Sequence, residues 1–173
     1  ELGEGEAGVL VLERTVFYAE SGGEVGDQGE IRWPGGRALV EDTTKDNAGR
    51  VLHWVTVVEG ALRKPFPLLE LFVSEDFRRS TQRNHTATHL LHAALRSVLG
   101  EGVRQAGSLV SPEHLRFDFT YGKPLTDAER TRVAGRALGG PLPSDRDRHD
   151  GASRPRQTVM TEELDRPRPR CDA

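Results

Sequence analysis

Short apolar runs separated by turn-forming residues make up the first part of the chain. "VLVLERTVFY", "RALVEDTTK" and "RVLHWVTVV" are rich in β-branched and aromatic residues and are bounded by Gly, Asp or Asn. This pattern is typical of β-strands. The glycine-rich stretch "AESGGEVGDQGEI" predicts turns between short strands, and "LLELFVSED" (68–76) predicts one more strand that leads into a helix.

From about Glu75 to Leu99 the apolar residues recur at helical spacing, and Gly100 stands where a glycine would end the helix. Residues 105–111 and 114–121 return to strand patterns, the second with alternating apolar and polar positions. "LTDAERTRVAGRALGG" predicts a second helix that begins with a capping box, with Thr126 as N-cap and Glu129 at the third helical position.

Composition separates this part of the chain from its end. After Gly140 the sequence is rich in proline and arginine and has few large apolar residues, so it is not expected to fold by itself. We therefore predict an α+β fold: a small β-barrel-like subdomain over residues 1–72, an incomplete α/β subdomain with the histidine-bearing helix over 73–140, and a disordered tail over 141–173.

Charge and cysteine content limit the classes of partner. The chain has 24 Lys and Arg against 27 Asp and Glu, a net charge of −3, so no general basic field exists and DNA is not expected as a partner. No apolar run is long enough to predict a membrane span. The single cysteine, Cys171, cannot form an internal disulfide. A reducing, cytoplasmic location is therefore expected.

The sharpest chemical pattern is a histidine stripe in "RNHTATHLLHAALR". His85 and His89 are four residues apart, so on a helix both imidazoles can point at one ion. Tetrahedral zinc needs further ligands, and the alternative is that these are ordinary surface or half-buried histidines. A zinc peptidase is not indicated, because Thr86 stands where the H-E-x-x-H motif has its general base.

The glycine cluster and Gln105 each have both a structural and a functional interpretation. The glycines of "ESGGEVGDQG" predict tight turns that need positive φ, and the sequence lacks the Gly-Lys-Ser/Thr of a phosphate loop. Gln105 in "QAGS" either satisfies its amide locally or, if a hairpin brings it near the histidines, holds a substrate or a water. His114, His149 and Cys171 have no spacing that makes them additional ligands.

"TVFYAESGGEVGDQGEI" (15–31) and "RNHTATHLLHAALRSVLGEGVRQAGSLVSPEHLRFDFTYGKPLT" (83–126) together resemble the editing region of bacterial alanyl-tRNA synthetases. This region also occurs in freestanding relatives that deacylate mischarged tRNA. The resemblance covers about residues 8–135. It implies hydrolysis of seryl- or glycyl-tRNA(Ala), with the acceptor end of tRNA(Ala) as partner and zinc as cofactor. It also implies that residues 73–140 are part of an editing subdomain like the second additional domain of threonyl- and alanyl-tRNA synthetases.

The resemblance also implies roles for single residues. His85 and His89 match zinc ligands, which in the family are joined by a Cys and a His from a Cys-Gly-Gly-Thr-His segment. Gln105 matches a position near the editing pocket. Thr86 and Thr88 lie between the ligands and are candidates to sense the serine hydroxyl, with plain helix packing as the alternative. The turn that lies at the same pocket in relatives matches Glu20, Ser21, Gly22 and Gly23.

After about Arg132 the sequence departs from the family and contains no Cys-Gly-Gly-Thr-His. The arginine- and proline-rich composition there is what a frame change in a GC-rich gene would produce. The chain also lacks the family's ATP-dependent aminoacylation domain, so we expect no activation of alanine by it. Two hypotheses follow: a zinc-dependent deacylase with only the HxxxH half of its site, or a tRNA-binding or relic module without turnover.

Overall fold

The computed structural model of the chain describes residues 1–139 in full and the backbone of residues 158–159 and 161–165. Two units are distinguished. The first contains residues 1–21 and 25–78 together with the two strands near the C-terminus, and the second contains residues 22–24 and 79–139 of the described chain. The division falls between Arg78 and Arg79, whereas the sequence predicts a boundary at 72/73.

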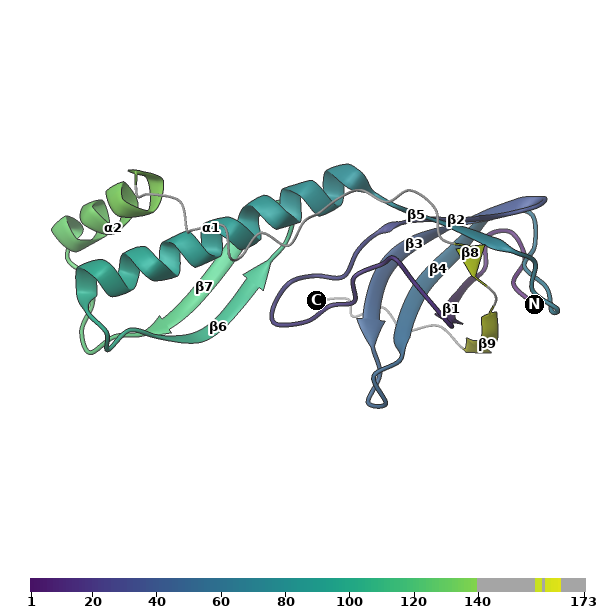
Figure 1. The fold of residues 1–173 in the computed structure, drawn as a ribbon, viewed down its shortest axis with the longest axis horizontal. Helices are drawn as coiled ribbons and strands as arrows, with labels where there is room; N and C mark the ends of the chain where they lie inside the picture. Colours follow the sequence, from purple (N-terminus) through teal and green to yellow (C-terminus); the bar gives the residue numbers. More distant parts are fainter. Residues whose placement is uncertain (140–157, 160, 166–173) are drawn as a thin grey trace. The chain divides into compact units, whose positions relative to one another are not determined.

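The first unit is built on one antiparallel sheet with the strand order β8-β5-β2-β3-β4-β1-β9 (Figure 1). Four of these strands come from segments that the sequence predicts as strands, whereas β2 begins at the end of the glycine-rich stretch that was predicted to form turns. The bounds are β1 (Ala7–Leu12), β2 (Gly29–Trp33), β3 (Gly36–Lys45), β4 (Val51–Glu59), β5 (Leu69–Val73), β8 (Thr158–Val159) and β9 (Thr161–Asp165).

Alternation along the strands places one face of this sheet in the core. In β4, His53, Val55 and Val57 are buried, and the residues between them are half-buried. Burying one large aliphatic side chain contributes about 1.5–3 kcal/mol, so the buried cluster holds the sheet together. Its members are Leu10, Leu12, Phe17, Ile31, Trp33, Ala38, Val40, Val55, Val57, Leu62, Phe66, Leu69 and Leu71.

The sheet is open where the sequence predicts a barrel-like subdomain. In the described part of the chain β8 pairs with β5 and β9 pairs with β1, which places these two short strands at opposite edges. No pairing between described residues joins the two edges, so no closed barrel is formed. Most of the predicted tail, 141–173, lies outside the described residues, and the backbones of β8 and β9 are what the structure describes of it.

The second unit combines two helices and a hairpin. Helix α1 spans Glu75–Leu99, its first turn belonging to the first unit, and α2 spans Asp127–Gly139. Between them β6 (Arg104–Val110) pairs with β7 (Leu115–Thr120). The hairpin runs alongside α1 (Figure 1). A second core forms from Ala94, Leu95, Val103 and Val133, with Leu91, Val98, Leu99, Phe117, Phe119, Tyr121 and Ala137 packed against it.

The predicted helix ends are confirmed. Gly100 has a φ of +101° and donates its N–H to the carbonyl of Arg96 at 2.9 Å, as expected of a glycine that ends a helix. In the capping box the Glu129 N–H donates to Thr126 Oγ1 at 3.2 Å and the Thr126 N–H donates to Glu129 Oε2 at 2.8 Å. These bonds satisfy N–H groups that a helix leaves without an intrahelical partner.

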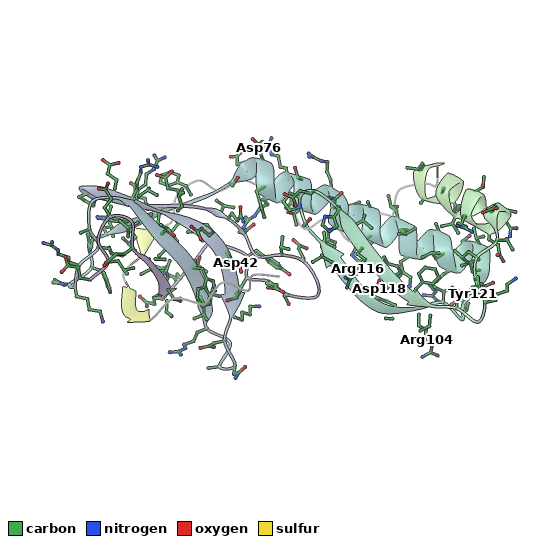
Figure 2. All side chains as sticks on the ribbon, turned by 180° about the vertical axis from the view of Figure 1, so that it is seen from behind. Asp42, Asp76, Arg104, Arg116, Asp118 and Tyr121 are labelled. Carbon is green, nitrogen blue, oxygen red and sulfur yellow. The ribbon has the colours of Figure 1, made fainter. Side chains whose placement is uncertain are left out.

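Alternation in β7 separates an apolar from a polar side of the hairpin. Phe117 and Phe119 pack against the second core, and the alternating positions before each of them are the polar residues Arg116 and Asp118. Arg116 Nε donates to Asp118 Oδ2 at 3.1 Å, and Figure 2 shows both side chains on the hairpin. Over the described residues, neither helix is long and apolar enough to cross a membrane.

Candidate functional site

Helix α1 brings His85 and His89 together on consecutive turns, as the four-residue spacing predicts. Their Nε2 atoms are 2.9 Å apart, with the ring centroids 4.8 Å apart and the planes at 39°. Both side chains are exposed. In tetrahedral zinc, bonds of about 2.0–2.1 Å separate two ligand nitrogens by roughly 3.3 Å. The pair therefore needs only a small adjustment for both nitrogens to contact one ion.

A short loop of residues 22–24, which we call the glycine loop, lies against strand β6. The Val110 N–H donates to the carbonyl of Gly23 at 2.7 Å, and Glu24 forms a parallel bridge with Val110. Gly22 and Gly23 have φ of +62° and +84°, as predicted for turns, whereas Gly26 and Gly29 of the same cluster do not have positive φ. A Cβ on Gly23 would lie 2.3 Å from the carbonyl oxygen of Ser108. Only glycine therefore allows this close approach.

Glu24, which the sequence analysis does not single out, lies directly against the histidine pair. Its carboxylate contacts Nδ1 of His85, the ring nitrogen that faces away from His89. The Glu24 side chain is 17% exposed and that of His85 is 46% exposed. The contact joins residues 61 positions apart, so helical spacing could not reveal it. The one local indication is that Glu24 follows the two glycines directly.

Gln105 forms a local hydrogen bond, which is the simpler of the two roles predicted for its amide. Its Nε2 donates to Ser108 Oγ at 3.0 Å, and Ser108 Oγ donates to the carbonyl of Gly22 at 3.3 Å. The amide is thus linked through one hydroxyl to the glycine loop. Because Gln105 is exposed, a substrate could still reach its amide.

The two threonines between the histidines, Thr86 and Thr88, differ in their exposure to solvent. Thr86 Oγ1 donates to the carbonyl of Gln82 at 3.0 Å, and Thr88 Oγ1 donates to that of Asn84 at 2.8 Å. Thr88 is 9% exposed, which favours the packing role for it. Thr86 is exposed and lines an open depression on α1 together with Arg79, Gln82 and Arg83. Its hydroxyl oxygen can still accept a hydrogen bond there.

Glu20 and Ser21, the other two predicted pocket residues, belong to the first unit. The Glu20 N–H donates to the carbonyl of Thr43 at 2.8 Å, and the carbonyl of Ser21 accepts a hydrogen bond from the Tyr18 hydroxyl at 3.2 Å. Both side chains are exposed. The structure thus brings Gly22 and Gly23 into one unit with the histidine pair and leaves Glu20 and Ser21 in the other.

The histidine pair has the spacing to provide two ligands to a metal ion. Among the described residues, no group of three or more His, Cys, Asp or Glu side chains is arranged to hold an ion. Glu24 contacts Nδ1 of His85, so its carboxylate lies on the opposite side of that ring from the His89 nitrogen. His92 packs on Phe117 with ring centroids 5.1 Å apart. His149 and Cys171 lie outside the described residues.

The sequence is similar to one family of enzymes throughout most of its length. Residues 1–66 match the family of class II (A) tRNA synthetases. An alanine–tRNA ligase of Thermus thermophilus is 56% identical over 133 residues, which is 77% of this chain and 15% of that protein. The chain is related to alanine–tRNA ligases. The enzyme of Thermotoga maritima is 51% identical over 124 residues (72% of this chain, 14% of the relative), and that of Nitratidesulfovibrio vulgaris is 51% identical over 132 residues (76% and 15%).

The region that aligns with the Thermus alanine–tRNA ligase spans the positions of the histidine pair. Any continuous stretch of 133 residues in a chain of 173 includes residues 41–133, and so it contains α1, which the family match to residues 1–66 does not reach. The chain spans about 15% of the length of these ligases.

Proposed function

We propose that this chain acts in editing: it hydrolyses the ester bond of seryl- or glycyl-tRNA(Ala) at the acceptor end of the tRNA. The observation that carries the proposal is the convergence of the His85 and His89 Nε2 atoms, 2.9 Å apart, in the unit that also holds the glycine loop and Gln105. The relationship to alanine–tRNA ligases supports it. A pocket that accepts alanine rejects glycine poorly, because one methyl contributes only about 1–3 kcal/mol to discrimination.

The chemistry needs few groups, because an aminoacyl ester is already activated. The site must hold the ester, position a water and stabilise the oxyanion that develops. The exposed Gln105 amide can donate to a substrate oxygen, and the Thr86 hydroxyl is placed to contact a serine side chain. Zinc held by His85 and His89 would act as a Lewis acid. The described residues offer two ligands for such an ion, fewer than the four of a tetrahedral site.

A second candidate function is tRNA binding without turnover, and two observations favour it. No third ligand for an ion is found in the described part of the chain, and a two-histidine site binds zinc weakly. In addition, Arg79 and Arg83 line the depression on α1 with Gln82 and Thr86. Guanidinium groups bind phosphate through paired hydrogen bonds, so this surface suits the backbone of an acceptor stem.

One set of assays tests both functions. The purified chain is incubated with seryl-tRNA(Ala) after EDTA treatment and across a zinc titration. We expect hydrolysis on the order of 100-fold above the spontaneous rate, lost in the double variant His85→Ala/His89→Ala. His114→Ala, which removes an exposed histidine of the hairpin turn, is the matched control and keeps the activity.

The outcome separates the candidates. If seryl-tRNA(Ala) binds but its ester survives at every zinc concentration, the hydrolase proposal is wrong. Binding that weakens in Arg79→Ala/Arg83→Ala, and that falls with rising salt in the unchanged chain, would then support the binding module. If the chain neither binds nor hydrolyses the substrate, both proposals fail.

A further inference from the structure

The contact between Glu24 and His85 determines which ring nitrogen of His85 is free. A carboxylate accepts hydrogen bonds, so the Nδ1 that it contacts must carry the hydrogen. In a neutral imidazole the other nitrogen then has a lone pair. Nε2 of His85 therefore faces His89 as an acceptor or as a ligand.

The same reasoning assigns the hydrogen of His89. Its Nε2 lies 2.9 Å from Nε2 of His85, and two lone pairs at that distance would repel each other. In the chain without an ion, His89 therefore donates its Nε2–H to His85. The two neighbouring histidines are thus opposite tautomers, His85 with its hydrogen on Nδ1 and His89 with its hydrogen on Nε2. For both nitrogens to hold one cation, only His89 must give up or move its hydrogen.

Backbone contacts to strand β6 hold Glu24 in place beside His85. Its backbone is bridged to Val110, and the preceding Gly23 carbonyl accepts the Val110 N–H at 2.7 Å. Its carboxylate is largely buried, whereas the His85 ring is nearly half exposed. A largely buried acceptor that is anchored by its backbone orients the more exposed imidazole ring.

We propose that Glu24 is a positioning residue: it holds His85 in the Nδ1–H tautomer and so presents Nε2 toward His89 for a divalent transition-metal ion such as zinc. The inference rests on the proposed function for the choice of ion, but the tautomers themselves follow from the hydrogen bonds alone. A carboxylate that accepts the N–H of a metal-ligating histidine raises the basicity of that histidine and fixes the orientation of its ring. Removing such a carboxylate commonly lowers metal affinity about 10–100-fold.

The decisive experiment is long-range ¹H–¹⁵N NMR on the full chain with ¹⁵N-labelled histidine, free of metal and at about pH 8, above the ordinary imidazole pKa of about 6.5. We expect a protonated Nδ1 and an unprotonated Nε2 for His85, and the reverse for His89. In Glu24→Ala, His85 should relax to the mixed tautomers of a solvated imidazole. Glu24→Gln, which keeps an acceptor oxygen at the same reach, should restore much of the Nδ1–H form.

The matched control is Glu101→Gln, which alters an exposed carboxylate paired with Arg96. It should leave both tautomers unchanged. Zinc affinity, measured by competition with a chromogenic chelator, should fall about 10–100-fold in Glu24→Ala and stay constant in the control. An unchanged backbone amide spectrum would show that Glu24→Ala keeps the fold, so that a tautomer change is not simple unfolding.

The inference is overturned if His85 carries its hydrogen on Nε2 in the unchanged chain, or if Glu24→Ala keeps the Nδ1–H form. Its failure is distinct from that of the proposed function. The predicted tautomers without ester hydrolysis would contradict only the hydrolase, and hydrolysis with the opposite tautomers would contradict only the role of Glu24.

Discussion

Replacing Gly23 with alanine tests whether close packing of the glycine loop on β6 positions the site. Gly22→Ala is the matched control, since both glycines have positive φ, +84° and +62°. The two positions differ in the space around the new Cβ. At Gly23 it would lie 2.3 Å from the Ser108 carbonyl oxygen and 2.7 Å from Ser108 Oγ, whereas at Gly22 nothing lies within 4 Å.

The expected magnitudes follow from the positive φ that the two positions share and from the space in which they differ. A left-handed backbone costs a non-glycine residue roughly 1–2 kcal/mol, and both variants share that cost. The contact at Gly23 must open by about 1 Å to reach an ordinary van der Waals distance, and overpacking of this kind costs about 1–3 kcal/mol more. If the loop instead leaves β6, it loses the Val110–Gly23 hydrogen bond, which contributes about 1 kcal/mol.

Urea unfolding monitored by the circular dichroism of the helices measures the stability of the second unit, in which Gly23 lies. The second unit contains α2 and most of α1, while both tryptophans, Trp33 and Trp54, lie in the first unit. We expect the helical transition of Gly23→Ala to lose about 1–3 kcal/mol more than that of Gly22→Ala, with little change in tryptophan fluorescence.

Two outcomes would refute this reasoning. Equal losses of stability in the two variants would show that the loop moves away from Ser108 without cost. A Gly23→Ala chain that is destabilised but keeps the Nδ1–H tautomer of His85 would show that the loop does not position Glu24.

Two further predictions concern the first unit and are measured by tryptophan fluorescence during urea unfolding. Burial lowers the pKa of His53 from 6.5 to about 4, so the unfolded chain binds the proton first. The free energy of unfolding should have its full value above about pH 6.5 and should fall by up to roughly 3 kcal/mol as the pH is lowered toward 4. A stability that stays constant between pH 6.5 and pH 5 would contradict this prediction. Arg78 Nε donates to Oδ1 of the buried Asp27 at 3.0 Å, so Arg78→Met should cost about 2–4 kcal/mol. Adding Asp27→Asn should recover part of that loss, and equal stability of the single and double variants would refute the pairing.

Local patterns predicted the secondary elements well. Helix α1 spans Glu75–Leu99 as expected, and the capping box at Thr126 forms as the sequence indicates. These features depend on bonds between residues three to five positions apart, which a short stretch of sequence contains in full.

The arrangement of the sheet could not be predicted in the same way. Alternation indicates that a segment is a strand but not which strand it pairs with. Strand β1 pairs with β4 and β9, and the edges stay open where a barrel-like subdomain was expected. The hydrogen-bond partner of Gln105 could not be predicted either. It is Ser108 because the register of the hairpin shifts between Gln105 and Gly107.

The sequence by itself determined that His85 and His89 share one face of a helix, because four residues complete about one helical turn. Only the tertiary structure decided which residue contacts Nδ1 of His85. Glu24 reaches Nδ1 because the glycine at position 23 lets the loop approach β6 closely, at the Ser108 carbonyl. That contact spans 61 positions and depends on backbone packing between distant segments, which spacing along the chain does not encode.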